Sequence, residues 1–231
     1  MPPFPRALPM VAAALSIAAC AAASSRTWPG SQPVRITDPT RRIQFRGFSV
    51  LPPTGPGWFA MPPVPADPAP IYLVARFAKV VDHADTPDVH TTEAEVHIWD
   101  VGWRMFAGAD DFLQFEKEQA ERLADSYVDG RHRVLAKSTM LDTILGAQCV
   151  KYEFGVENIV PDAPGKSVTL EVRGYRCLHP RWPQYLIDVS YSERYVAGEH
   201  AFHLDSSEVA PFLKSLSFTD DRPLFVTDSS R

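Results

Sequence analysis

Two of the three cysteines in this chain fall in neighbouring segments whose patterns are typical of β-strands. Residues 148–156 and 168–177 both alternate apolar and polar side chains, and the sequence PDAPGK between them is typical of a turn. If the segments form an antiparallel hairpin centred near residue 163, Cys149 lies opposite Cys177. Because paired cysteines in an exported protein usually form a disulfide, we expect a Cys149–Cys177 bond.

Two further residue pairs favour this register. Glu153 would face Arg173, which carries the opposite charge, and Phe154 would face Val172 on the apolar side. One register thus accounts for the thiols, the charges and the apolar residues together. A redox-active or nucleophilic cysteine is the alternative, but the chain has no C-x-x-C spacing that would favour it.

Other residues suited to catalysis or metal binding form weaker patterns. The chain has no G-x-S-x-G, G-x-G-x-x-G or P-loop motif. His83, His90 and His97 recur every seven residues, and His200 and His203 form an H-x-x-H pair. This spacing crosses a loop and a strand, so we expect solvated surface histidines, no metal site and no cofactor. Because a Ser–His–acid triad is recognised by geometry, an envelope hydrolase stays open as an alternative.

A run of basic and aromatic residues around the second cysteine could bind an anionic sugar or lipid head group. It comprises Arg173, Tyr175, Arg176, His179, Arg181 and Trp182. The alternative is an outer sheet face on which the arginines pair with Glu153 and Glu171, and this is the arrangement we expect.

The beginning of the chain is typical of an export signal. Arg6 is followed by 13 uncharged residues, Ala7–Ala19, a run too short to span a bilayer as a helix. The sequence IAAC that ends at Cys20 resembles the bacterial lipobox, which implies cleavage before Cys20 and acylation of its thiol. The alternative is an ordinary signal peptide whose removal releases a soluble protein. In such lipoproteins an aspartate after the cysteine favours the inner membrane, so Ala21 favours the outer membrane.

These features divide the chain into four segments. We predict a lipoprotein signal peptide over 1–19, a lipidated flexible tether over 20–42, a single α+β domain over 43–219 and a polar tail over 220–231. An edge strand around residues 34–36 is the alternative for the end of the tether.

Strands and helices alternate in blocks along the predicted domain. The eight prolines of residues 52–70 predict a stiff loop between the first two strands, because proline cannot donate to a sheet. Besides the two cysteine segments, alternation predicts strands over 43–51, 71–81, 92–99, 132–137, 140–145 and 185–191.

Two helices are predicted from capping patterns. Asp111 with Gln114 predicts a capping box at the start of a helix over 110–128, with Glu116 on its outer side. Residues 205–208, DSSE, predict a second capping box and a short helix to about residue 216. An antiparallel sheet with helices packed against it accounts for all these elements.

Two short sequences in this domain resemble the Mog1/PsbP-like family. GFSVLPPTGPGW resembles the family's early strand, which runs into P-x-x-W, and VAPFLKSLSF resembles its terminal helix and following strand. The resemblance spans about residues 43–219 and implies an α/β/α sandwich. It also implies an accessory role, such as binding a partner protein or docking onto a membrane complex. It assigns no functional residue to this chain.

Composition narrows the function classes further. The 231 residues are 45% hydrophobic and carry a formal net charge of −5, which suits a globular domain and gives no basic surface for nucleic acid. We therefore predict a lipid-anchored periplasmic lipoprotein with a non-catalytic accessory role at an envelope partner. The alternatives are a lipoprotein that binds a small ligand (a glycan, lipid or metal) and an unrecognised envelope hydrolase.

Overall fold

The structure is a computed structural model of the chain. It describes residues 32–62, 71–79, 91–102, 104–127, 132–144, 146–159, 167–196 and 206–223. Two of the predicted segments, 1–19 and most of 220–231, therefore lie outside the described residues, as does Cys20.

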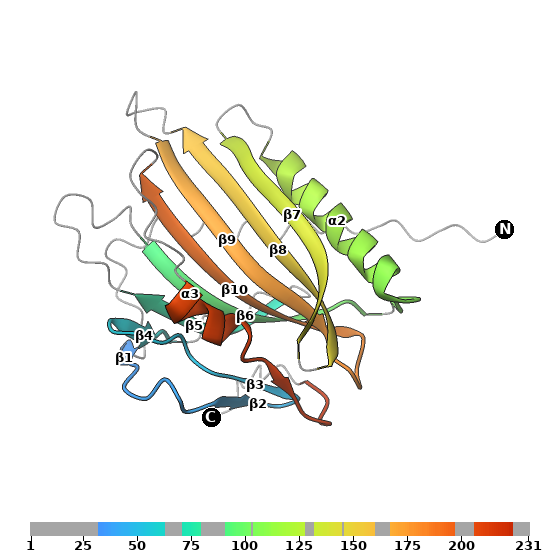
Figure 1. Cartoon of the computed structure of the whole chain (residues 1–231), viewed down its shortest axis with the longest axis horizontal. Coiled ribbons are helices and arrows are strands. Elements are labelled where there is room, and N and C mark those ends of the chain that lie inside the picture. The colour runs from blue at the N-terminus through green and yellow to red at the C-terminus, as the bar shows by residue number, and fades with distance from the viewer. Residues whose placement is uncertain are drawn as a thin grey trace.

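Eight strands of the described residues form one antiparallel sheet (Figure 1). After β6 the chain passes through a helix to the far edge at β7, and it then returns strand by strand until β10 pairs with β6. In spatial order the strands are β1 (Val34–Arg35), β4 (Trp58–Ala60), β5 (Ile71–Lys79), β6 (Thr91–Asp100), β10 (Tyr185–Val196), β9 (Ser167–Leu178), β8 (Ala147–Ile159) and β7 (His132–Ile144).

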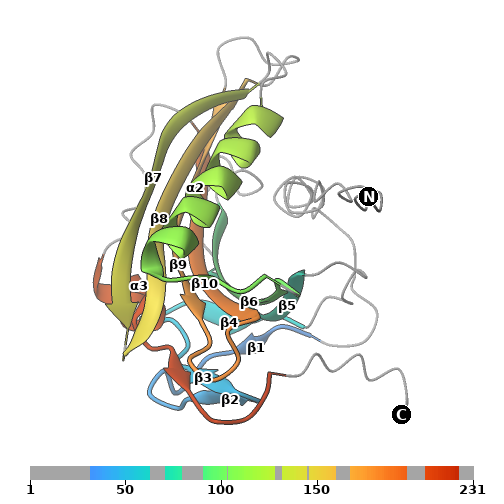
Figure 2. The same cartoon turned by 90° about the vertical axis from the view of Figure 1, so that its right-hand side faces the viewer.

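The two described helices lie on opposite faces of this sheet. The sheet is strongly bent, and α2 (Ala109–Ser126) lies on its concave side against β7 and β8 (Figure 2). On the other face, α3 (Ser206–Leu213) packs against β10 beside a small sheet of β2 (Ile43–Phe45), β3 (Phe48–Val50) and β11 (Ser217–Phe218). The described chain is thus an α+β domain with an antiparallel sheet, as the sequence predicts.

Strand alternation divides the apolar core between the two faces. Odd-numbered residues of β10, such as Ile187 and Val189, pack with Phe212 of α3 and are fully buried. Even-numbered Leu186 packs on the other face with Phe112 of α2. Each helix therefore covers its own apolar layer, and the sheet separates the two layers.

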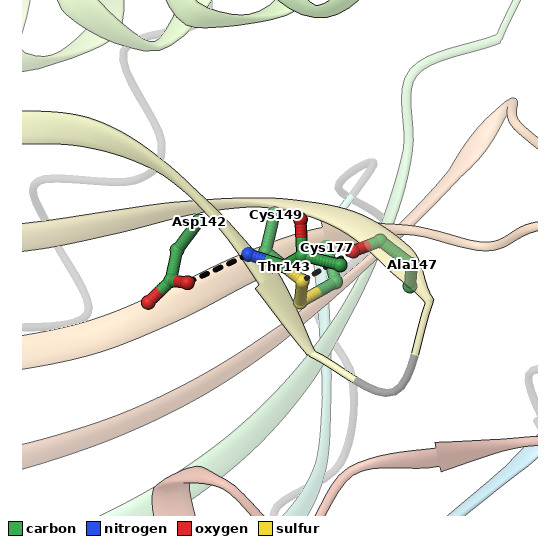
Figure 3. Close-up of a disulfide and its surroundings, with 5 residues drawn as sticks. All are labelled: Asp142, Thr143, Ala147, Cys149 and Cys177. Atoms are coloured by element: carbon green, nitrogen blue, oxygen red, sulfur yellow. Dashed lines mark hydrogen bonds between the residues drawn. A yellow bond between two sulfur atoms is a disulfide. The ribbon is translucent and has the colours of Figure 1, made fainter.

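The β8–β9 hairpin has the register predicted from its sequence. Cys149 lies opposite Cys177, Glu153 opposite Arg173 and Phe154 opposite Val172. The two cysteines form a disulfide, and both are fully buried on the α3 face of the sheet (Figure 3).

The segment 43–51 is a tight hairpin, which corrects the prediction of a single strand. β2 and β3 pair with each other across residues 46 and 47. Gly47 has a φ of 92°, a left-handed conformation that glycine adopts readily. A Cβ at this position would lie 2.9 Å from the carbonyl oxygen of Asp221, so the close approach of the chain also requires glycine.

Two other strand predictions are corrected. β4 lies within the proline-rich segment that was predicted to be a loop, because its three residues contain no proline and pair with both β1 and β5. β7 is one continuous strand where the sequence predicts two strands separated after Lys137, since pairing with β8 continues through Ser138 and Thr139.

The sheet begins before residue 43. β1 pairs with β4, and the backbone N–H of Ile36 donates to the carbonyl of Trp58 at 3.0 Å. This edge strand is the alternative that the sequence left open for the end of the predicted tether over 20–42.

The first turn of α2 is capped differently from the prediction. Gly108 is the N-cap residue and offers no side chain. Asp111 lies within the first turn, and its carboxylate accepts a hydrogen bond from the backbone N–H of Ala107 at 3.0 Å. Gln114 donates instead to Glu118, so the Asp111–Gln114 capping box is wrong. Asp205 of the second predicted capping box lies outside the described residues. The helix there, α3, ends at Leu213 and not at about residue 216 as predicted.

Candidate functional site

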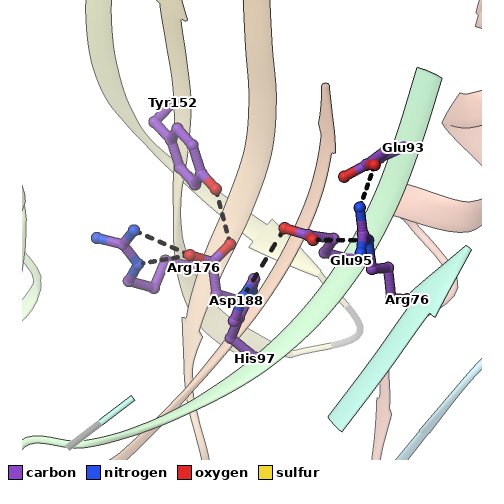
Figure 4. Close-up of polar contacts among 7 residues, drawn as sticks. All are labelled: Arg76, Glu93, Glu95, His97, Tyr152, Arg176 and Asp188. Carbon is purple, nitrogen blue, oxygen red and sulfur yellow. Dashed lines mark hydrogen bonds and ion pairs between the residues drawn. The ribbon is translucent and has the colours of Figure 1, made fainter. Parts of the chain in front are cut away.

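A row of charged and polar side chains crosses the concave face of the sheet, on the side that carries α2. Arg176 on β9 lies opposite Asp188 on β10, and Asp188 lies opposite His97 on β6. Residues that face each other in antiparallel strands direct their side chains to the same face. Figure 4 shows seven members of this row, which we call the concave-face row: Arg76, Glu93, Glu95, His97, Tyr152, Arg176 and Asp188.

Arg176 is the centre of the row. Its Nε and Nη2 donate to Asp188 Oδ2 at 3.1 and 2.9 Å, and its Nη1 donates to Glu116 Oε2 at 2.5 Å. The guanidinium carbon lies 3.9 Å from the centre of the Trp99 ring, within range of a cation–π contact. Burial opposes its charge, but Glu116 and Asp188 outweigh burial and raise the pKa of Arg176 above its usual value. Arg176 is therefore a permanent buried cation.

Glu116 reaches the row from α2 and was expected on the outer side of that helix. Its side chain is only 2% exposed, so the expectation is wrong. The helix turns Glu116 toward the sheet together with Phe112 and Phe115, which precede it by four and one positions and are both buried. Burial, partly offset by Arg176, raises the pKa of Glu116.

Tyr152 joins the concave-face row from β8. Its hydroxyl donates to Asp188 Oδ1 at 2.8 Å. Burial and the negative charge of Asp188 raise the pKa of Tyr152 well above its usual range, so the hydroxyl stays a donor. The ring lies across Gly174 of β9, where an added Cβ would fall 2.5 Å from the tyrosine oxygen. The position of the Tyr152 ring in the row thus depends on glycine at position 174.

The other half of the row is formed by β5 and β6. Arg76 forms an ion pair with Glu93 and a longer one, 3.6 Å, with Glu95. The second Glu95 oxygen lies 3.8 Å from His97 Nε2. Glu95 is 27% exposed, and its burial among the other carboxylates raises its pKa. This half is therefore more accessible to solvent than the Arg176 half.

Several buried polar atoms near the row have no hydrogen-bond partner among the described residues. They include one acceptor, Glu116 Oε1, and two donors, Trp99 Nε1 and Gln119 Nε2. Gln119 follows Glu116 by three positions, so both lie on the same side of α2. Buried polar groups usually have partners, so leaving these atoms without one is a cost that the other contacts of the domain offset.

The chemistry open to this row is ligand binding and proton exchange. Arg176 and Tyr152 keep their protons, so neither supplies a base. Glu95 beside His97 combines partial exposure with a raised carboxyl pKa, which suits a group that exchanges a proton with a bound molecule.

The arginines around the second cysteine do not gather on one surface, and Arg176 pairs with Glu116 and Asp188 instead of the expected Glu153 or Glu171. Arg173 lies on the opposite face of the sheet from Arg176 and is 3.9 Å from Glu153, in agreement with the expected outer-face pairing. Arg181, in the turn after β9, pairs with Asp220 at 3.1 Å. Successive residues of a strand alternate between faces, and this alternation separates Arg173 from Arg176.

His179 has a structural role in that turn. Its Nδ1 accepts from the backbone N–H groups of Arg181 and Trp182, and its Nε2 lies 3.0 Å from the carbonyl oxygen of Gly47. Burial lowers the pKa of His179, which favours the neutral ring that these contacts require. A small pocket of about 270 Å³ between this turn and β11 contains His179 and Phe218.

Of the predicted histidines, only His97 lies within the described residues. His83, His90, His200 and His203 lie outside them. The described residues contain no group of three or more His, Cys, Asp or Glu side chains that could hold a metal ion.

Within the described ranges, no helix is both long enough and apolar enough to cross a membrane. Neither a protein-family model nor a curated protein sequence matches this chain.

Sequence reasoning missed the concave-face row, although two signals for it were present. Gly174 interrupts a strand of β-branched and aromatic residues, which often marks the close approach of another group. Glu116 follows Phe112 by four positions and so lies on the same helical face, which predicts burial despite the charge.

Proposed function

We propose that this chain is a lipid-anchored protein of the bacterial cell envelope, facing the periplasm, whose domain has an accessory role at an envelope partner. The observation that carries the proposal is the short uncharged run ending at Cys20, followed by a domain with a buried disulfide. Disulfides form and persist in oxidising compartments, so the bond supports export. The outer membrane is the proposed location, because Ala21 follows the cysteine.

A Mog1/PsbP-like fold is part of this proposal. One antiparallel sheet with α2 on one face and α3 on the other supports it, since this order of layers is an α/β/α sandwich. The accessory role follows from that resemblance, and a non-catalytic domain is proposed on the same ground.

Membrane fractionation of a Cys20→Ala variant tests the anchor. The thiol is the acylation site in the proposal, so we expect the variant to leave the membrane pellet and to lose its acyl mass. An Ala23→Ser variant, which keeps Cys20, serves as the matched control and should stay in the pellet. If Cys20→Ala stays in the membrane and the parent protein carries no acyl group, the lipoprotein proposal is wrong.

Crosslinking in cells tests the accessory role. Reproducible capture of one envelope protein by the acylated chain would support it, and the contact residues would show which face of the domain binds. Failure to capture a partner, under conditions that capture established envelope complexes, would contradict it.

Binding of a small ligand at the concave-face row is the second candidate function. The observation that favours it is the partly exposed Glu95 carboxylate, whose two oxygens lie 3.6 Å from Arg76 Nε and 3.8 Å from His97 Nε2.

A further inference from the structure

β7 forms one edge of the eight-stranded sheet, and among the described strands it pairs only with β8 (Figure 1). Most of its side chains are exposed. Five large hydrophobic side chains are exposed among the described residues, and three of them lie on this strand: Leu135, Met140 and Leu141, at 46%, 52% and 38% exposure. An open edge of this kind presents backbone N–H and C=O groups to which another strand can pair.

The helix on the concave side leaves this edge open. The buried sheet residues that pack with α2 belong to β8, β9 and β10, and they are Val150, Phe154, Val156, Leu178 and Leu186. On β7 itself, Lys137 and Leu141 are exposed although they lie opposite Phe154 and Val150 on the same face. A further strand can therefore approach β7 beside the helix.

The backbone groups that point outward from β7 belong to alternate residues. Cys149 and Cys177 face each other with Cα atoms 4.0 Å apart, which is the close spacing of a non-hydrogen-bonded pair. The backbone N–H and C=O of Cys149 therefore point toward β7, where Asp142 lies opposite and bonds with them. The alternate set directs its N–H and C=O groups to the open edge and comprises Lys137, Thr139, Leu141 and Thr143.

Thr143 and Lys137 show that this edge is weakly protected. The N–H of Thr143 donates to the carboxylate of Asp142 at 2.7 Å, a local acceptor that suits an N–H facing no neighbouring strand (Figure 3). An edge lysine often blocks pairing, but the ammonium of Lys137 is paired with Glu121 of α2. The strand contains no proline, and its register shift lies at one end, between Val134 and Ala136. Residues 136–144 therefore form a regular edge.

This regular edge is complementary to a second copy of itself. Residues 136–144 are centred on Met140, so an antiparallel copy can pair along their whole length if Met140 faces Met140 of that copy. Leu141 then faces Thr139, and Thr143 faces Lys137, so every outward N–H and C=O of this stretch has a partner. A register shifted by two residues places Thr143 opposite the bulge or Lys137 beyond the end of the strand.

The side chains also match in this register. Met140 lies on the same face as Asp142 and Cys149, the α3 face, and would contact its own copy at the twofold axis. Ser138 would face Asp142, whose carboxylate can accept from the serine hydroxyl as well as from its present donor. No two like charges face each other, so the edge favours self-pairing.

From these features we propose that two copies of this chain pair antiparallel through β7, about a twofold axis at Met140. Such an interface uses the same surface of both copies and closes after two. The inference goes beyond the proposed function and requires neither the lipid anchor nor an envelope partner.

Disulfide trapping of the purified full-length protein in detergent tests the register. Since Met140 bonds to β8, it would form a non-hydrogen-bonded pair with its copy, with Cα atoms about 4.5 Å apart. A Met140→Cys variant should therefore form a covalent dimer under mild oxidation. Ser138→Cys is the matched control on the same face, because the two residues 138 would be offset by four positions, about 13 Å. It should form no covalent dimer, and neither should the parent protein.

Equal trapping of the Met140→Cys and Ser138→Cys variants would overturn the proposal, because it would indicate random collision. Absence of a covalent dimer from folded Met140→Cys protein would overturn it as well.

Sedimentation of the same proteins measures the association itself. We expect the parent to be a dimer at tens of micromolar. Met140→Lys should raise the dissociation constant at least tenfold, because two ammonium groups would face each other at the axis. Met105→Lys adds the same charge at a residue that is 71% exposed and outside β7, and it should change the constant less than twofold. This control also reports any association through the detergent.

A parent protein that stays monomeric, or equal effects of the two lysine substitutions, would contradict pairing through β7. Capture of a different envelope protein at position 140 by a monomeric parent would likewise overturn self-pairing, and it would assign the edge to that partner.

Discussion

Arg176 illustrates how single residues hold a charge inside this domain. Its three donor nitrogens contact Asp188 and Glu116, and its flat face lies on Trp99. Taking such charges out of water is costly, and removing one partner of a buried pair typically costs about 3–5 kcal/mol. The arrangement is therefore stable only while all its members are present.

A Gly174→Ala substitution should destabilise the domain by about 1–3 kcal/mol, because the new methyl group overlaps the Tyr152 ring. The displaced ring would also weaken its hydrogen bond to Asp188. Urea unfolding measures the change. Gly155→Ala on β8 is the matched control, since its nearest neighbour would be 3.6 Å away, and it should change stability by less than about 1 kcal/mol. Equal effects of both substitutions would contradict the steric argument.

Glu193 makes stability depend on pH. It is 1% exposed, and neither carboxylate oxygen has a hydrogen-bond partner among the described residues. Burial, reinforced by the Glu171 carboxylate, raises the pKa of Glu193 to about 7, from an ordinary value of 4.5. The folded state therefore keeps this proton at pH values where the unfolded chain loses it. This contribution to stability is present below about pH 4.5 and is lost as the pH rises to about 7.

The free energy of unfolding should accordingly decline between pH 5 and 7, with Glu193 contributing at most about 1.4 kcal/mol per pH unit. His179 contributes in the opposite direction, because burial lowers its pKa and its contribution is lost as the pH falls below about 6.5. Comparison with a Glu193→Gln variant isolates the carboxyl group, and the variant should show a flatter profile. Identical pH profiles for the two proteins would show that Glu193 does not titrate in this range.

At the scale of elements, the β8–β9 hairpin is the best-defined unit. Its register places an opposite-charge pair and apolar pairs on their proper faces, and the disulfide closes it across 28 positions. A covalent link of this length mainly reduces the conformational freedom of the unfolded chain.

Replacing Cys149 and Cys177 together by alanine should lower the free energy of unfolding by about 3–4 kcal/mol. Chemical denaturation of the parent and the double variant under non-reducing conditions provides the measurement. Because both sulfur atoms are fully buried, a reductant should act on the parent only when denaturant is present. A double variant as stable as the parent would show that the bond contributes nothing to the fold.

Across the whole molecule, the segment that follows the N-terminal edge strand contacts the C-terminal part of the chain through Arg42. Arg42 donates through Nε to Ser49 Oγ at 2.9 Å and through Nη2 to the carbonyl oxygen of Ser215. Ile36 packs against the core on the α3 side. Residues 34–42 therefore contribute to the stability of the domain.

A chain that starts at residue 43 should be less stable than one that starts at residue 32, by roughly 2–4 kcal/mol. The shorter chain loses β1, the Ile36 contact and the hydrogen bonds of Arg42. Thermal and urea unfolding of the two truncated proteins would measure the difference. Equal stability would place the domain boundary at residue 43, as the sequence pattern predicts.

The sequence by itself determined the features that depend on short-range patterns. The β8–β9 register and the Cys149–Cys177 pairing follow from alternation around one turn. The antiparallel α+β class follows from the strand and helix patterns along the domain. The export signal and Cys20 are also read from local composition alone, and they remain predictions.

Only the tertiary structure decided which strands became neighbours and what the concave face carries. Glu116, Arg176 and Asp188 are 60 and 12 positions apart along the chain, and they meet because β10 pairs with both β6 and β9 beneath α2. A local pattern predicts that a charged residue on a helix is exposed, since burial of a charge is costly. The cost is offset here by partners from distant strands, and no local pattern contains that information.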